Sequence, residues 1–553
     1  MSIRQVGILG AILLLSLLVR LYKLDTIPFG LNIDEASMGY NAYSLLQTGK
    51  DRYGEAFPVI FRSFGSFQAP LYTYFTVPAI FLFGANIFAV HLVSALSGFI
   101  VVCATFLIGY LGLKQNFKQT IVITIVVAFT PWSILFTRFA TEASLGLALF
   151  VFSIPFFILS LRKIYFFIPA SFFLGLATHA YYSERVISVI FFIGFIFLFL
   201  KKLLMNKKWL ICGICVFVAT LLPHMAIFGS GAFSRRLEQV NYFSEATFLE
   251  QGGNLRNFPF GKSMYIAREF SSQYLAYFSP RNLFFDPDPQ GARSIPDLSV
   301  FYSWMVTPFF IGIYYLFKKR SLPINKILIL VVLISPIPAS LTRDPFYTIR
   351  TLDYLWSISF IIGIGIYNLL TKIHYFYFKV GLILTFLFFS ITIFYVSYFV
   401  LFKYERAENF GYSYIKLFEF IEQNKNFSQK NFVIDTSREL GAGVRMAFLK
   451  KYDPPKIQQT LKPKVGNMYY GSVEFVEEYA LDNIEVRPIF WKGDVYKEQI
   501  LVGDSLAISE GQIKEHKLKL EFEIKDLTDR VSLKGYSTNP KEKQESDRMK
   551  NIF

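Results

Sequence analysis

The sequence predicts a polytopic α-helical membrane protein that ends in a small α/β domain. Three observations lead to this fold class. Of the 553 residues, 53% are hydrophobic and 18% aromatic, only 17% carry a charge, and the mean hydropathy is +0.41. Apolar runs of roughly 15 to 26 residues, long enough to cross a bilayer, recur up to residue 402. From residue 403 onward the chain is rich in charged residues and has no such run.

The first apolar run, residues 5–21, follows Arg4 and resembles the core of a signal peptide. No convincing small-residue cleavage site follows it, and residues 20–25 lead directly into an acidic segment. We therefore expect an uncleaved first span with the N-terminus in the cytoplasm.

Eleven spans are expected along the chain. They lie near residues 5–21, 87–111, 119–136, 143–161, 164–180, 187–200, 209–228, 299–317, 325–342, 351–371 and 377–402. With the N-terminus inside, five connecting segments fall on the cytoplasmic side, and each of them contains lysine or arginine. Cytoplasmic loops of membrane proteins collect these residues, so the formal net charge of +16 needs no nucleic-acid partner.

The apolar segment 70–84 is excluded from this count. It is about 15 residues long and contains Pro70 and Pro78, and a further crossing here would place every later basic loop outside. We expect a helix along the outer membrane surface, within an external loop that spans residues 22–86. The count then places the C-terminal domain outside the cell, in a multi-pass protein of the cell membrane.

Two adjacent carboxylates, Asp34 and Glu35, stand in this external loop after a turn that contains Pro28 and Gly30. The residues that follow, 35–47, have apolar side chains on one helical face, which predicts an amphipathic helix lying on the membrane. A carboxylate pair at a membrane surface is costly unless it is solvated or used. The pair therefore indicates either a solvated loop or a functional site, and both interpretations stay open.

The other external loops contain polar residues that the distribution of basic loops does not explain. They are Arg138 and Glu142; His179, Tyr181, Tyr182 and Arg185; and Arg343, Tyr347 and Arg350. Arginine grips phosphate through its planar fork, so a cationic cluster facing a carboxylate pair indicates a site for an anionic, membrane-embedded substrate.

Six of these nine residues also have a structural interpretation. Arg138 and Glu142 are four residues apart and suit a helical ion pair. His179 suits packing, Tyr181 and Tyr182 suit an interfacial aromatic belt, and Arg343 suits a local pair with Asp344. The long external loop 229–298 is either an ordered cap over a site or a solvated connection.

Beyond residue 402 the patterns predict an α/β domain over residues 403–540. Residues 412–424 and 441–451 are expected to be helical, and residues 432–435 and 517–524 to be strands. The polar residues 541–553 are expected to form a disordered tail. Neither a phosphate-binding glycine loop nor a metalloprotease motif occurs in the sequence.

The chain resembles the type-C glycosyltransferase superfamily, in its protein O-mannosyltransferase-like branch, which includes bacterial aminoarabinose transferases acting on lipid A. The resemblance covers about residues 1–400 and rests on the external acidic pair and on five short segments in order. These are residues 68–72, 83–86, 91–96, 137–142 and 341–345. The sequence departs from the branch at Gln68, where bacterial relatives often have lysine, and at His91, where they often have arginine.

The resemblance implies a membrane glycosyltransferase that moves a sugar from a polyprenyl-phosphate donor to an external acceptor hydroxyl with inversion. Asp34 would be the general base, and Glu35 would orient the acceptor or bind a metal. The donor phosphate and sugar would contact the nine polar residues given above, Arg138 to Arg350. The acceptor is a lipid, a glycan or a protein, the metal site is unknown, and no cofactor is expected beyond, at most, a divalent cation.

Two other classes stay open on the residues alone. A transporter or flippase of a lipid-linked glycan would have its key charges near the bilayer midplane and broken helices there. A structural assembly factor would tolerate the loss of Asp34, which an enzyme would not.

Overall fold

The computed structural model describes residues 1–466, 468–471 and 477–550. The chain divides into two compact units. Unit 1 comprises Met1–Leu24, Ala69–Tyr72 and His91–Leu401, and unit 2 comprises Asp25–Gln68, Thr73–Val90 and Phe402–Phe553. This grouping differs from domain limits of 1–402 and 403–540, because residues 25–68 and 73–90 of the first external loop group with the C-terminal residues rather than with the membrane helices.

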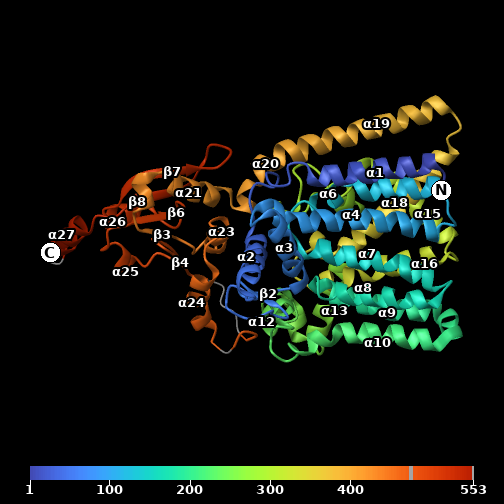
Figure 1. The fold of residues 1–553 in the computed structure, drawn as a ribbon, viewed down its shortest axis with the longest axis horizontal. Helices are drawn as coiled ribbons and strands as arrows, with labels where there is room; N and C mark the ends of the chain where they lie inside the picture. Colours follow the sequence, from blue (N-terminus) through green and yellow to red (C-terminus); the bar gives the residue numbers. More distant parts are fainter. Residues whose placement is uncertain (467, 472–476, 551–553) are drawn as a thin grey trace. The chain divides into compact units, whose positions relative to one another are not determined.

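Unit 1 is a bundle whose long helices run side by side (Figure 1). These helices are α1 (Ile3–Leu21), α4 (Ile87–Gly112), α5 (Phe117–Phe129), α7 (Glu142–Ser160), α8 (Phe167–Ala177), α9 (Tyr182–Leu203), α10 (Lys207–Met225), α15 (Val306–Lys318), α16 (Pro323–Ile334), α18 (Leu352–Lys372) and α19 (Phe376–Phe394). Shorter helices are α6 (Pro131–Leu135), α11 (Arg235–Val240), α12 (Glu245–Gln251), α13 (Gly261–Ala276), α14 (Pro280–Phe284) and α17 (Pro336–Ser340). A π-helical turn, Tyr395–Leu401, follows α19.

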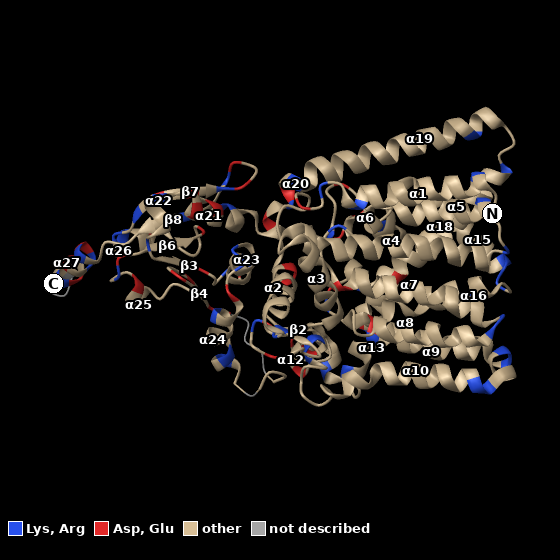
Figure 2. Ribbon diagram, in the orientation of Figure 1, with Lys and Arg blue, Asp and Glu red and all other residues tan. Residues whose placement is uncertain are grey.

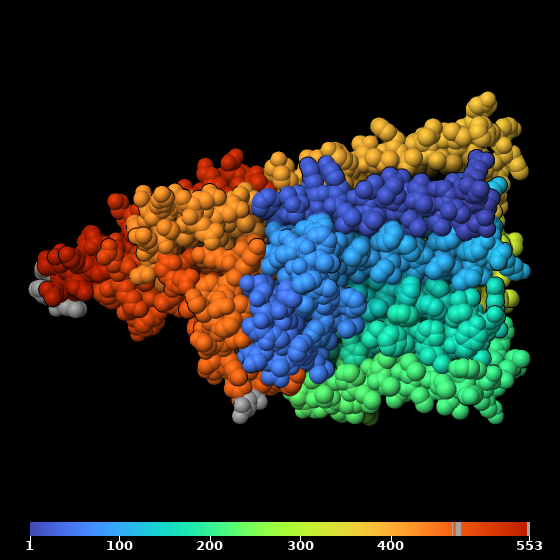
Figure 3. All heavy atoms as spheres, in the orientation of Figure 1, coloured from blue at the N-terminus to red at the C-terminus, as the bar shows by residue number. Residues whose placement is uncertain are grey.

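In the described chain, seven continuous helical stretches are long and apolar enough to cross a membrane. One of them, Tyr182–Met225, is 44 residues long and joins α9 to α10, whereas α5 and the Ile164–Ala177 stretch are shorter apolar helices. The chain is a multi-pass membrane protein, and the count of eleven spans stays a prediction. On α1, which lies at the surface of the unit (Figure 3), Leu14, Leu15 and Leu18 are more than half exposed. Such a surface requires lipid rather than water.

The connecting loops at one end of the unit 1 bundle, the end at which the N-terminus lies, contain basic residues, and further basic residues lie toward the other end (Figure 2). The loops between α4 and α5, α7 and α8, α9 and α10, α15 and α16, and α18 and α19 all contain lysine or arginine. Five basic loops at the same end are the pattern expected of a cytoplasmic face. Which side of the membrane each terminus occupies stays a prediction.

Glycine allows α15 and α18 to pack backbone against backbone. A Cβ atom at Gly365 would lie 1.8 Å from the carbonyl oxygen of Pro308, and one at Gly312 would lie 2.1 Å from that of Ile361. Small residues at helix crossings permit such close approach within membranes, where van der Waals contact replaces the hydrophobic effect as the driving force. A larger side chain at either position would separate the two helices.

Unit 2 begins with α2 (Ile33–Thr48), the hairpin β1 (Phe61–Ser63) and β2 (Ser66–Gln68), and α3 (Pro70–Phe83), which joins it from Thr73 onward. The apolar face of α2, with Met38, Ala42 and Leu45, is buried, and α2 also contacts α23 (Ala442–Leu449), whose Phe448 ring lies against Gly39. The expectation that this face lies on the membrane is therefore wrong, because the protein itself covers it. Gly39 permits the approach of Phe448, because a Cβ atom at position 39 would lie 3.0 Å from the Phe448 ring.

The C-terminal part of unit 2 is an α/β fold around a six-stranded sheet of order β4-β5-β3-β6-β8-β7. Its strands are β3 (Phe432–Ile434), β4 (Tyr479–Leu481), β5 (Ile484–Val486), β6 (Ile500–Gly503), β7 (Lys519–Lys525) and β8 (Val531–Ser537). The central β3 pairs in parallel with β5 and β6, and the outer pairs are antiparallel. Its helices are α20 (Phe402–Glu405), α21 (Tyr412–Gln423), α22 (Lys425–Ser428), α23, α24 (Pro454–Val465), α25 (Trp491–Asp494), α26 (Glu510–His516) and α27 (Pro540–Lys550).

The C-terminal end differs from the disordered tail predicted for residues 541–553. Residues 540–550 form α27, in which the Lys543 ammonium contacts the Asp547 carboxylate one turn later at 2.6 Å. Ion pairs of this spacing stabilise an otherwise polar helix. Residues 551–553 lie outside the described chain.

Candidate active site

Helix α2 begins with a capping box that separates the roles of the two adjacent carboxylates. The Asn32 side chain accepts from the Glu35 amide at 2.9 Å, and the Glu35 carboxylate accepts from the Asn32 amide at 2.6 Å. Glu35 is therefore fully buried at the start of the helix, while Asp34 is exposed. The helix N-terminus favours both negative charges.

Asp34 is held from β2. The Gln68 side-chain amide donates to the Asp34 side chain and to the Asp34 backbone carbonyl, both at 3.2 Å. The Gln68 carbonyl oxygen accepts from the Ser37 hydroxyl at 2.7 Å. Because Gln68 is the last residue of the β1–β2 hairpin and is only 4% exposed, the hairpin fixes its reach toward α2.

A buried ion pair lies behind this contact, also within unit 2. The Arg52 guanidinium contacts the Glu477 carboxylate through Nε at 3.2 Å and Nη2 at 2.7 Å, and the two side chains are 0% and 5% exposed. The hydroxyls of Tyr53 and Tyr479 also donate to this carboxylate. Burial alone would raise the pKa of Glu477, but the charge of Arg52 and these hydrogen bonds outweigh burial and lower it.

Asp51, next to this pair in sequence, is a carboxyl of the opposite kind. Its side chain accepts from the amides of Tyr53 and Glu55 and from the Tyr469 hydroxyl. Burial raises the pKa of Asp51 to about 6, because these hydrogen bonds and Arg52 only partly offset the loss of water. Neighbouring carboxyls in unit 2 thus titrate in different pH ranges.

Arg138, in unit 1, occupies a structural position. Its side chain is fully buried, and its five N–H groups donate to the carbonyls of residues 19, 20, 22 and 23 and to the Tyr398 hydroxyl. Residues 19 and 20 belong to the last turn of α1, whose end lacks intrahelical donors, and residues 22 and 23 follow it directly. Arg138 therefore caps α1, and its predicted contact with a donor phosphate stays a prediction.

A second group of unit 1 surrounds the ring of Tyr347. The guanidinium carbons of Arg293 and Arg350 lie 3.4 Å and 3.8 Å from the ring centroid. Arg293 also pairs with the buried Asp288 carboxylate at 3.1 Å, and Asp288 accepts from the Thr348 hydroxyl at 2.7 Å. One Arg293 nitrogen, Nη1, is buried and has no hydrogen-bond partner among the described residues.

Other predicted donor residues lie near the Tyr347 ring and its two arginines. Tyr181 lies within electrostatic range of Arg350, Tyr347, Arg236 and Glu142. Burial raises the pKa of Tyr181, and the nearby arginines oppose this shift, so its hydroxyl is a neutral hydrogen-bond donor at pH 7.

Tyr182 belongs to the same neighbourhood. The Arg185 guanidinium lies 4.4 Å from the centroid of its ring, and Glu142 is within electrostatic range of both residues. Six of the nine predicted donor residues therefore form one cluster of unit 1.

Two of the predicted donor residues have other neighbours. The His179 ring stacks on His224 with centroids 4.0 Å apart, and its Nε2 contacts the Thr220 carbonyl. Arg343 donates to the carbonyl of Asn241 and to the hydroxyl of Thr247. Arg343 thereby ties down the 229–298 loop, which folds into helices α11 to α14 around a small core of its own.

Sequence reasoning missed Arg52, Glu477, Asp288, Arg236 and Arg293 as candidate site residues. The ion pair of Arg52 and Glu477 joins residues 425 positions apart, and no local sequence pattern predicts it. The capping box Asn32-x-x-Glu35, in contrast, is visible in the sequence and assigns Glu35 to the helix end.

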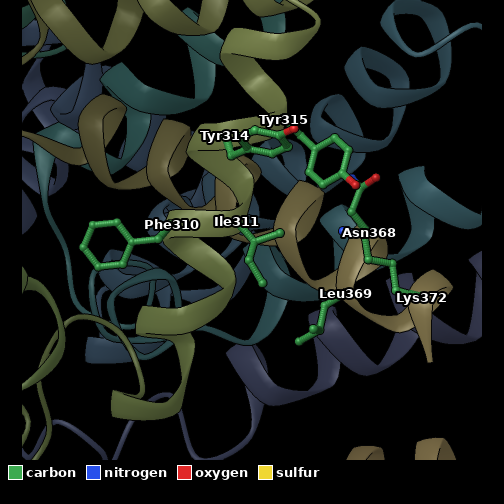
Figure 4. Close-up of a pocket in the computed structure, with 7 residues that line it drawn as sticks. All are labelled: Phe310, Ile311, Tyr314, Tyr315, Asn368, Leu369 and Lys372. Carbon is green, nitrogen blue, oxygen red and sulfur yellow. The ribbon is translucent and has the colours of Figure 1, made fainter.

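A groove of about 380 Å³ opens between α15 and α18 (Figure 4). Its lining is apolar and aromatic apart from Asn368 and Lys372, and it includes none of the candidate site residues. Within the described chain, no group of three His, Cys, Asp or Glu side chains is placed to hold a metal ion. We therefore assign no metal ligands.

Comparison with known proteins shows the fold. Neither a family model nor a curated protein sequence matches the chain. Among solved structures it is similar to ArnT from Cupriavidus metallidurans in the apo state, with a TM-score of 0.54, 10% sequence identity, and coverage of 97% of this chain and 98% of ArnT. ArnT bound to undecaprenyl phosphate aligns at a TM-score of 0.51 and 11% identity, over 96% of this chain and 98% of ArnT. The predicted fold of type-C glycosyltransferases is thereby confirmed.

Proposed function

We propose that the protein is a membrane glycosyltransferase that moves a sugar from a polyprenyl-phosphate donor to an acceptor hydroxyl. The observation that carries the proposal is the fold shared with ArnT over nearly the full length of both chains. A structure of ArnT contains undecaprenyl phosphate, and a donor of this class suits a chain with both apolar helices and buried arginines.

The acid–base part of the reaction is assigned to Asp34. The attacking hydroxyl must lose its proton as its oxygen bonds to the anomeric carbon, and an exposed carboxylate can accept that proton. Glu35 is buried in the capping box, so its role is to fix the turn that presents Asp34. Displacement of the phosphate from the opposite face inverts the anomeric configuration.

The phosphate part is assigned to the cluster around Tyr347 in unit 1. The leaving group departs as the polyprenyl phosphate, so it needs stabilisation of negative charge and no proton from an acid. Arg350 and Arg293 lie against the Tyr347 ring, and the buried Nη1 of Arg293 can donate to a phosphate oxygen. The neutral hydroxyl of Tyr181 adds a further donor.

The test is a product assay with the purified full-length protein in lipid vesicles. A panel of undecaprenyl-phosphate sugars, each labelled in the sugar, is offered with membrane lipid and glycan extracts as acceptors. We expect one donor to release undecaprenyl phosphate and to transfer its label, and Asp34→Asn to abolish the transfer. The proposal fails if no donor is cleaved while the folded protein binds undecaprenyl phosphate.

The same assay separates the alternative class. A transporter or flippase would move the labelled lipid between leaflets and leave its sugar–phosphate bond intact. Movement without cleavage, unaffected by Asp34→Asn, would therefore favour transport over transfer.

A further inference from the structure

We infer that the C-terminal part of the chain orients Asp34 through a directional chain of hydrogen bonds that runs from Glu477 through Arg52, Ser37 and Gln68. All five residues belong to unit 2. The contacts are 2.7 Å from Arg52 to Glu477, 2.7 Å from Arg52 to Ser37, 2.7 Å from Ser37 to Gln68 and 3.2 Å from Gln68 to Asp34. Gln68, Ser37 and Arg52 are thus positioning residues.

The direction of the chain follows from the chemistry of its members. A guanidinium only donates, so the Ser37 oxygen must accept from Arg52 Nη1. The single Ser37 proton is then available to the Gln68 carbonyl oxygen. The Gln68 side chain can satisfy this contact only with its carbonyl toward Ser37, which turns its NH₂ group toward Asp34.

Burial makes this orientation persistent. Ser37 and Arg52 are 0% exposed, and Gln68 is 4% exposed, so water does not compete for their hydrogen bonds. Reversing the Gln68 amide would set its NH₂ group against the Ser37 proton and its carbonyl against Asp34. Glu477 sets the direction of all these hydrogen bonds, because it accepts from two of the Arg52 nitrogens and leaves Nη1 to donate to Ser37.

The consequence for Asp34 is twofold. An N–H donor on one carboxylate oxygen fixes the rotation of the carboxylate, and it stabilises the charged form, which a general base requires. Charged groups near the start of α2 include Glu35 and Arg445, which donates to the Leu31 carbonyl and pairs with Glu439. None of these is changed in the variants below.

The first test needs no substrate. The full-length protein is treated with a water-soluble carbodiimide and an amine, which label protonated carboxyls, and labelling of the Asp34 peptide is followed by mass spectrometry against pH. We expect Gln68→Met to move the labelling midpoint to higher pH, and Ser37→Ala to move it in the same direction. An unchanged midpoint in Gln68→Met would overturn the inference.

The matched control is Gln458→Met. The Gln458 amide donates to Ser44, Thr48 and the Asp51 carbonyl, so it contacts the other end of α2. It takes no part in the hydrogen bonds that lead from Glu477 to Asp34. This variant is expected to lower the melting temperature and leave the Asp34 midpoint unchanged. A shift equal to that of Gln68→Met would show a general loosening of α2 and would contradict the inference.

The second test is kinetic, and its catalytic meaning rests on the proposed function. Gln68→Met should lower kcat about 10- to 100-fold with little change in the KM for the donor, and should move the acid limb of the pH–rate profile upward. In an Asp34→Asn background the same substitution should have no further effect. If Asp34→Asn is slow but Gln68→Met retains the native rate and pH profile, the chain of hydrogen bonds is refuted and the proposed function stands. If Asp34→Asn is fully active, the proposed function itself fails.

Discussion

Removing the charge of Glu477 should destabilise unit 2 far more than removing the charge of its neighbour Glu478. The two residues are adjacent, and each contacts a cation, at 2.7 Å for Glu477 with Arg52 and at 2.9 Å for Glu478 with Lys464. The side chains of the first pair are 0% and 5% exposed, whereas those of the second are 41% and 51% exposed. Burial is therefore the main difference between the pairs.

The expected magnitudes follow from that difference. In Glu477→Gln the Arg52 guanidinium stays buried without its anion, and breaking a buried pair in this way costs about 3–5 kcal/mol. In Glu478→Gln the loss is at most about 1 kcal/mol, because water and salt already screen the exposed pair. In a unit of roughly 200 residues, each kcal/mol of lost stability lowers the melting temperature by about 2–4 °C. Glu477→Gln should therefore melt roughly 6–20 °C lower than the native protein.

The assay is thermal unfolding of both variants in the same detergent, with limited proteolysis to locate the change in unit 2. The pKa of Glu477 is lowered in the folded protein, so the ion pair stabilises the fold fully above about pH 4.5, the ordinary value, and this stabilisation declines as pH falls below it. Adding Arg52→Met to Glu477→Gln should recover part of the loss. Equal melting temperatures for Glu477→Gln and Glu478→Gln at pH 7 would refute the reasoning.

Three further predictions follow from the site. Arg138→Ala should lower the melting temperature, since each hydrogen bond from its charge to a carbonyl is worth about 1.5–3 kcal/mol, and an unchanged melting temperature would contradict the capping role; a loss of affinity for undecaprenyl phosphate in the same variant would support the predicted phosphate contact. Arg350→Lys should weaken binding of undecaprenyl phosphate about tenfold, because lysine retains the charge but not the planar fork that stacks on Tyr347 and donates to the Thr342 hydroxyl, and unaltered binding would exclude Arg350. The pKa of Asp51 is about 6 in the folded protein and 3.8 ordinarily, so ionising this carboxyl destabilises the fold. As pH rises from 4 to 7, the free energy of unfolding of the native protein should fall by up to about 3 kcal/mol relative to that of Asp51→Asn. A difference between the two proteins that does not change with pH would contradict this.

The membrane part of the fold was predictable because the bilayer sets the length of its elements. The predicted spans near 87–111 and 351–371 match α4 and α18 to within a residue or two. What covers an element was harder to predict. The periodicity of residues 35–47 indicates an amphipathic helix, but nothing in it shows whether a membrane or the protein itself covers the apolar face.

The candidate site was predictable where its signals are local. The pair Asp34–Glu35 and the segment 181–185 stand out because charged and polar residues are rare beside apolar runs. Arg138 stood out for the same reason, and the sequence could not show that carbonyls at the end of α1 and just after it, together with the Tyr398 hydroxyl, accept from its five N–H groups. Glu477 and Arg293 resemble ordinary loop residues in the sequence, and only the tertiary structure shows that they are buried.

The central claim is that Asp34 is the general base of sugar transfer, and single-turnover kinetics test it most directly. Native protein, Asp34→Asn and Glu35→Gln are each saturated with the undecaprenyl-phosphate sugar that the panel identifies, and the rate of transfer to acceptor is measured. We predict that Asp34→Asn still binds the donor but transfers about 10²–10⁴-fold more slowly, as expected for a positioned base. Glu35→Gln should lose less activity and more stability. Transfer by Asp34→Asn at the native rate would contradict the account, and an inactive, fully folded Glu35→Gln would move the base to Glu35.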